Sequence, residues 1–133
     1  MSSKFTESAE KALNNALHLA ENFGHTYVGS EHILLALAED KDSRAAEMLA
    51  ECGADNEKIR NAIADYSGCG EKTKLTARDL TPKCREIIAN AHAISVSNGA
   101  PQVYPEHILT ALCEDKGSVA SKILRKFRVN LKS

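Results

Sequence analysis

The sequence predicts an all-α fold built from two tandem repeats, and three observations point to it. Apolar residues make up 43% of the 133 residues, yet Trp is absent and aromatic residues reach only 5%, so the core must be aliphatic. These apolar residues recur at spacings of three and four, which is typical of helices. An offset of 75 residues aligns 5–58 with 80–133 without a gap, and 17 of the 54 aligned pairs are identical.

The first repeat, about residues 5–66, resolves into four helices. An apolar stripe between Phe5 and Phe23 predicts the first, which we expect to end at Gly24. The third should carry Met48 and Cys52 on its inward face. Each helix is expected to begin at a polar N-cap residue: Thr6, Ser30, Ser43 and Asp55.

Residues 67–79 are polar and contain glycine, so we interpret them as a connector rather than a domain. The second repeat, about residues 80–133, follows the same scheme through three helices and stops at NLKS, one turn into its fourth. We interpret this stop as a truncation of a longer protein. A half of roughly 55 residues buries too little surface to be stable alone, so the repeats should pack together.

Composition and charge exclude several classes of function. The net charge is -1 and no block of like charge is long enough to follow a phosphate backbone, which argues against nucleic-acid binding. No apolar run approaches the ~20 residues that cross a bilayer, and the N-terminus has no signal-peptide pattern. The four cysteines form no C-x-x-C pair, which is typical of reduced thiols. We therefore expect a soluble, cytoplasmic protein without a membrane partner.

Two blocks carry the repeat, SEHILLALAEDK at 30–41 and PEHILTALCEDK at 105–116. With KFTESAEKAL and GHTYVG before the first block, this pattern resembles the N-terminal domain of the Clp family of AAA+ unfoldases, the double Clp repeat, and is closest to the ClpC type. The resemblance covers essentially the whole chain. It implies a pseudo-twofold bundle of about eight helices, built from two tandem four-helix Clp repeats. The Glu-Asp-Lys triplet that ends each block is expected to be a solvated helix end.

The resemblance also implies a function. In that family the domain receives adaptor proteins and protein substrates, and ATPase modules of the same chain thread the substrate into a Clp peptidase. No G-x-x-x-x-G-K-[ST] motif occurs here, so we expect a non-catalytic recognition domain without a cofactor of its own. ATP and Mg²⁺ would belong to the parent protein. The alternative is a free-standing Clp-repeat adaptor or decoy, which an open reading frame without a Walker A motif after Ser133 would favour.

The candidate ligand-binding residues are Ser30, Glu31 and Glu106. The resemblance implies that the two glutamates bind the guanidinium of phosphorylated arginine, while the neighbouring helix N-termini hold its phosphate. The structural alternative is that a carboxylate in a first helical turn only interacts favourably with the helix dipole. Ser30 keeps a hydroxyl before Glu31, whereas Pro105 before Glu106 has none, so the two sites should not be equivalent.

Other candidates for chemistry have structural explanations. His32 and His107 follow the glutamates, but neither H-E-x-x-H nor H-x-x-E-H is present, so a metalloenzyme or small hydrolase is disfavoured and no metal site is predicted. We expect these imidazoles to satisfy hydrogen bonds near helix ends. Cys84 and Cys113 lie on apolar stripes and should be core residues, whereas Cys69 in the connector should be exposed.

Overall fold

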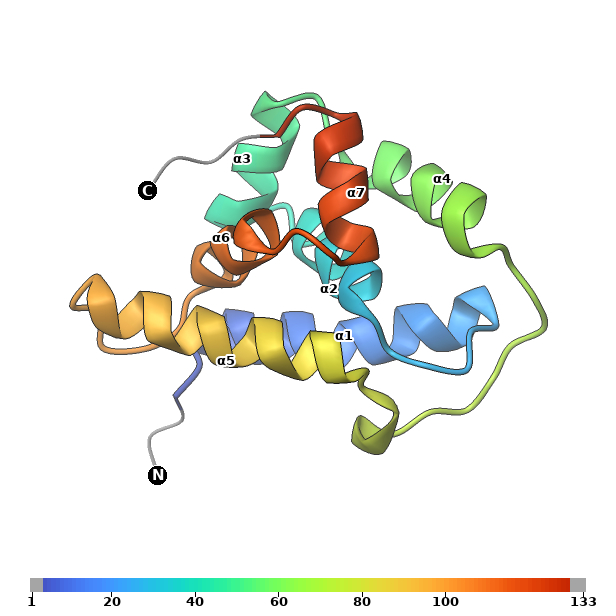
Figure 1. Ribbon diagram of the computed structural model, residues 1–133, viewed down its shortest axis with the longest axis horizontal. Helices are drawn as coiled ribbons and strands as arrows, with labels where there is room; N and C mark the ends of the chain where they lie inside the picture. Colours follow the sequence, from blue (N-terminus) through green and yellow to red (C-terminus); the bar gives the residue numbers. More distant parts are fainter. Residues whose placement is uncertain (1–3, 130–133) are drawn as a thin grey trace.

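The computed structural model describes residues 4–129 and confirms the all-α prediction (Figure 1). The predicted start of an eighth helix, at NLKS, lies outside this range. The first repeat holds α1 (Glu7–Phe23), α2 (Ser30–Glu39), α3 (Arg44–Glu51) and α4 (Asn56–Ser67). A 3-10 turn, η1 (Ala77–Asp79), leads to α5 (Pro82–Ser97), α6 (Pro105–Glu114) and α7 (Val119–Lys126).

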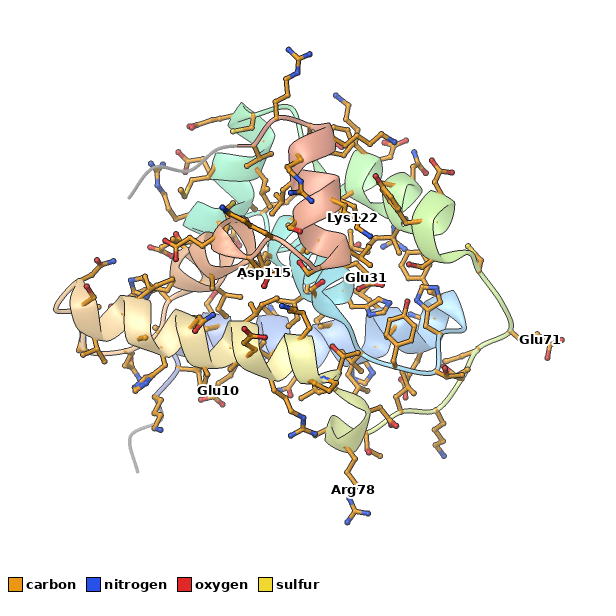
Figure 2. All side chains as sticks on the ribbon, viewed as in Figure 1. Glu10, Glu31, Glu71, Arg78, Asp115 and Lys122 are labelled. Carbon is orange, nitrogen blue, oxygen red and sulfur yellow. The ribbon has the colours of Figure 1, made fainter. Side chains whose placement is uncertain are left out.

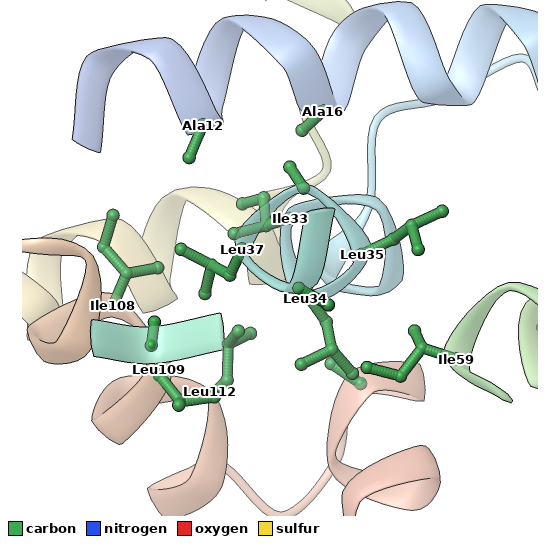
Figure 3. Close-up of a cluster of buried hydrophobic side chains, with 14 of the residues drawn as sticks. Ala12, Ala16, Ile33, Leu34, Leu35, Leu37, Ile59, Ile108, Leu109 and Leu112 are labelled. Atoms are coloured by element: carbon green, nitrogen blue, oxygen red, sulfur yellow. The ribbon is translucent and has the colours of Figure 1, made fainter. Parts of the chain in front are cut away.

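Helix α2 lies at the centre of the molecule and contacts all six other α-helices. Residues 30–38 are all buried, and Figure 3 shows the apolar side chains of α2 pointing in several directions, toward α1, α4 and α6. A helix that is apolar on every side is stable only in such an interior position. This position explains why the strongest motif of the sequence, EHILLALA, has no solvent-facing polar stripe.

Two isolated parallel backbone bridges join the repeats. Phe5 pairs with Val103, and Val28 pairs with Leu80. Four N–H···O=C hydrogen bonds of 2.7 to 3.0 Å close these bridges. The 75-residue offset converts one bridge into the other, so the start of each repeat is held by the loop between the first two helices of its twin. The prediction that the repeats pack together is therefore confirmed, because each repeat forms a backbone bridge to the other.

The repeated histidines cap the two central helices. The backbone N–H of Gly29 donates to His32 Nδ1 at 2.9 Å, and the N–H of Tyr104 donates to His107 Nδ1 at 2.9 Å. The hydrogen-bonding role predicted for these imidazoles is thus confirmed. Three of the four predicted N-caps are also confirmed by side-chain hydrogen bonds: Thr6, Ser43 and Asp55.

The fourth predicted N-cap, Ser30, was wrong, because α2 takes Gly29 as its N-cap and Ser30 as its first residue. The Ser30 hydroxyl accepts instead from the backbone N–H of Ala120, at 3.1 Å, across 90 residues of sequence. That N–H belongs to the first turn of α7 and has no intrahelical acceptor. A side chain of the first repeat therefore caps a helix of the second.

A chain of buried hydrogen bonds fixes the loop before α2. His32 Nε2 lies 2.7 Å from His25 Nδ1, and His25 Nε2 lies 2.8 Å from the carbonyl oxygen of Gly68. Because Gly29 donates to His32 Nδ1, the His32 proton must sit on Nε2, and both imidazoles must be neutral. Burial, followed by the nearby His25, lowers the His32 pKa to about 3.

The connector runs back along the C-terminal end of α1. Gly70 N–H donates to the carbonyl of Phe23 at 2.8 Å, and Thr73 N–H donates to that of Glu21 at 3.1 Å. Gly24 has a φ of +79°, and a Cβ at this residue would lie 2.4 Å from the backbone of Gly70. The glycine predicted to end α1 thus also allows the connector to approach closely.

The buried, neutral His32 makes stability depend on pH. Below pH 6.5 the unfolded chain protonates residue 32 whereas the folded chain does not, so stability is lost as pH falls. With a folded pKa of about 3, this group should cost about 2 kcal/mol of unfolding free energy between pH 7 and pH 5. Urea unfolding at both pH values should show this loss in the wild type and in His107→Gln, but not in His32→Gln. An equal loss in His32→Gln would contradict the assignment.

The cross-repeat cap should contribute to stability. Ser30→Ala leaves the Ala120 N–H without its acceptor, and we expect the free energy of unfolding to fall by about 1 kcal/mol. Ser97→Ala, at an exposed position near the end of α5, is the matched control and should leave stability nearly unchanged. Urea unfolding measures both variants, and equal midpoints for them would show that the cap contributes nothing.

Candidate functional site

A pocket of about 270 Å³ lies where the N-termini of three helices meet. The first repeat contributes Tyr27 and residues 29–31 at the start of α2. The second contributes Thr81, which is the N-cap of α5, Lys83 in the first turn of α5, and residues 117–119 at the start of α7. This pocket contains two of the three predicted ligand-binding residues, Ser30 and Glu31. The third, Glu106, does not line it.

Glu31 is almost completely buried, with 2% of its surface exposed, and Figure 2 places it in the middle of the fold. Its Oε2 accepts from the Tyr27 hydroxyl at 2.9 Å and from the Ser67 hydroxyl at 3.2 Å. Its Oε1 has no partner among residues 4–129. Every fully enclosed side-chain nitrogen or oxygen in that range has a partner, so Oε1 is not fully enclosed, and Glu31 is one of the residues that line the pocket. A carboxylate oxygen is thus held open to an incoming donor.

Tyr27 is held in place by a stack of rings. Its ring lies parallel to that of His25, with centroids 5.4 Å apart and an interplanar angle of 2°. His25 in turn stacks on Phe23, with centroids 5.3 Å apart. His25 is itself held by its hydrogen bond to His32. The loop before α2 therefore orients the Tyr27 hydroxyl that donates to Glu31.

Gly29 makes room for the Glu31 carboxylate. A Cβ at this residue would lie 2.4 Å from Glu31 Oε1 and 3.0 Å from the Tyr27 ring. Its φ of -110° is open to any residue, so the requirement is for space rather than for backbone conformation. The carboxylate folds back over the glycine, and any side chain there would displace it.

Another part of the pocket lining offers hydrogen-bond donors to a ligand. Within the described chain, the backbone N–H groups of Lys83 and Val119, in the first turns of α5 and α7, have no acceptor. The Lys83 ammonium lies 3.1 Å from Asp115 Oδ1 and 3.4 Å from Glu86 Oε2, and these bonds raise its pKa, which keeps it charged. Helix N-termini and a nearby cation together attract negative groups.

The Asp of each repeated Glu-Asp-Lys triplet anchors its loop to the first helix of its own repeat. Asp40 accepts from the Ser8 hydroxyl at 3.0 Å. Asp115 accepts from the ammonium of Lys83, which occupies in the second repeat the position that Ser8 has in the first. Asp115 also accepts from the N–H of Ser118 at 2.9 Å. The expectation of a merely solvated helix end was therefore wrong for these two aspartates.

The surroundings of Glu106 differ from those of Glu31. Glu106 is half-buried, and its carboxylate makes no hydrogen bond or ion pair within residues 4–129. Tyr104 occupies the position of Gly29, and Gln102 that of Tyr27, with its amide donating to the carbonyl of Phe5 at 3.2 Å. The surroundings of the two glutamates thus differ at more positions than the one that holds the proline before Glu106.

Several residues of the site were missed by sequence reasoning. Tyr27, Ser67 and Lys83 all belong to the surroundings of Glu31, yet none forms part of the repeated motif. Tyr27 and Lys83 lie at positions where the two repeats differ, and that difference was the available signal. Ser67 comes from the end of α4, a contact for which the sequence contains no pattern.

The four cysteines lie in different surroundings. Cys84 is buried, as predicted, and desolvation, with a smaller effect of Glu31, raises its pKa to about 12. Cys69 is exposed as predicted, and Cys113 is half-buried. Cys52 was wrongly placed on an inward face, because it ends α3 and is exposed. Within residues 4–129, no three side chains are grouped to hold a metal ion, and no helix could span a membrane.

Comparison with known proteins supports the sequence-based assignment. The chain is 33% identical to the ClpC/MecB negative regulator of genetic competence of Bacillus subtilis, over 98% of its own length and 16% of that protein. It is 30% identical to the chaperone ClpB of Oceanobacillus iheyensis, with the same coverage. The crystal structure of the N-terminal domain of ClpD from Arabidopsis thaliana shares its fold, with a TM-score of 0.75, 20% identity and coverage of 96% of this chain and 89% of that one.

The chain therefore spans about one sixth of the length of these two relatives. The family model of the Clp repeat (R) N-terminal domain matches it twice, at residues 4–80 and 79–133, which together include nearly every residue. With the duplicated helices, the reciprocal bridges and this double match, the chain belongs to the Clp repeat N-terminal domain family.

Proposed function

We propose that this domain recognises protein clients that carry a guanidinium group next to an anionic group, with phosphorylated arginine as the ligand. One observation carries the proposal, namely that Glu31 is only 2% exposed and still keeps a carboxylate oxygen without a partner in the described chain. Burying a charge costs free energy that a protein without a ligand would avoid. An incoming cationic donor would complete the hydrogen bonding of this carboxylate.

The pocket offers the two ends of such a ligand different partners. Glu31 Oε1 would accept N–H groups of the guanidinium, a charge-assisted pair that is stronger than a neutral hydrogen bond. The phosphoryl group would lie against the backbone N–H groups of Lys83 and Val119 and near the Lys83 ammonium. Ser30 contributes its hydroxyl hydrogen, because its oxygen already accepts from Ala120.

In a longer protein the domain would act by tethering. It would receive adaptor proteins and marked substrates and hold them near the ATPase modules of the same chain, which would deliver them to a Clp peptidase. The gain comes from effective concentration, so the affinity of the isolated site need only be modest. The domain itself performs no chemistry in this proposal and uses no cofactor.

The ligand assignment is tested by calorimetry with a short peptide that contains one phosphoarginine. Glu31→Gln removes the charge but can still accept from Tyr27 and Ser67, so we expect at least tenfold weaker binding in a folded protein. Glu31→Lys should abolish binding. Glu57→Gln, in the exposed first turn of α4, is the control and should bind like the wild type. Equal affinity for the unphosphorylated peptide would exclude phosphoarginine as the ligand.

The tethering role is tested with a ClpC-type unfoldase that lacks its own N-terminal domain. Fusion of this domain to the ring should restore degradation of an adaptor-dependent substrate. Addition of the same domain as a separate chain should not, because the effective concentration near the pore is lost. Full restoration by the separate domain would contradict tethering.

A further inference from the structure

We propose that this domain has one ligand site of the Glu31 type rather than two, and that Gly29 is the positioning residue that decides it. The inference rests on the proposed function. The repeats differ at this position, where the second has Tyr104. Both repeats keep the glutamate and the histidine cap, so the motif alone would suggest two sites.

The geometry around Glu31 requires a glycine at residue 29. A methyl group at the Cβ position there would come within 2.4 Å of Glu31 Oε1 and 3.2 Å of its carboxyl carbon. At these distances the carboxylate would have to move away from the methyl group. The ring of Tyr27 lies 3.0 Å from the same methyl position, so the methyl group cannot move toward that ring instead. The carboxylate conformation that leaves Oε1 open to the pocket therefore exists only without a side chain at residue 29.

The second repeat cannot adopt this conformation. Tyr104 has a Cβ, and its N–H is held by His107 just as Gly29 is held by His32, so the equivalent backbone is fixed in the same way. Tyr104 is exposed, and its ring meets that of His107 edge-on, with centroids 5.7 Å apart. Glu106 must turn away from the position that Glu31 occupies, and it is the more exposed of the two.

The other residues that surround Glu31 have no counterpart beside Glu106. Gln102 replaces the tyrosine that donates to Glu31, and Ser8 replaces Lys83. Ser8 already donates to Asp40, so the second position has no ammonium group in this place. Glu106 is half-buried and more exposed than Glu31, so without these neighbours its carboxylate gains less from pairing with a cation. We expect a binding stoichiometry of one phosphoarginine peptide per domain.

The test combines stoichiometry with a variant of Gly29 and a control variant, measured by calorimetry with the phosphoarginine peptide. The wild type and Glu106→Gln should both bind one peptide with the same affinity. Gly29→Ala should weaken binding at least tenfold. Ser97→Ala, at an exposed position outside the pocket, is the control and should change affinity less than twofold.

Thermal unfolding of each variant shows that it is folded before binding is compared. Two peptides bound per wild-type domain would overturn the inference, as would a loss of binding in Glu106→Gln equal to that in Glu31→Gln. Wild-type affinity in Gly29→Ala would overturn the role of the glycine. Absence of any binding by the wild type would instead reject phosphoarginine as the ligand, an outcome that differs from the other three.

Discussion

The reciprocal backbone bridges between the two repeats are the constraint on which the rest of the structure depends. Val28 and Val103 lie just before the central helices α2 and α6, and each is held by the opening residues of the other repeat. The bridges therefore set where the N-terminus of each central helix lies. Since Ser30 also caps α7, the pocket beside Glu31 can form only when both halves are folded together.

Burial of the Glu31 carboxylate costs desolvation free energy, and its neighbours offset part of that cost. Glu31 is removed from water in the first turn of α2, where the helix dipole and two hydroxyl donors offset part of the desolvation penalty. One of these donors, Ser67, ends α4, and the carbonyl of the next residue, Gly68, is held by His25. The histidine pair, the connector and the carboxylate thus form one hydrogen-bonded unit. We therefore expect a change in any of them to alter the position of the Glu31 carboxylate.

Duplication produced two similar backbones with different chemistry. Most of the fold was predictable from the sequence, because helix periodicity and three of the N-caps follow from local patterns. Of the candidate site, the sequence indicated Ser30 and Glu31 but not the partners that distinguish Glu31 from Glu106. Tyr27 and Lys83 come from different repeats, and no rule of spacing brings them together.

The sequence by itself determined the helices, the duplication and the family, since these depend on interactions between residues that are close along the chain or on a pattern that occurs twice. Only the tertiary structure decided what each polar side chain binds. Ser30 reads as the cap of its own helix, yet its hydroxyl accepts from Ala120, 90 residues away. Gly29 reads as a loop residue, yet it provides the space for a buried carboxylate. Such roles depend on distances across the interior, which folding alone establishes.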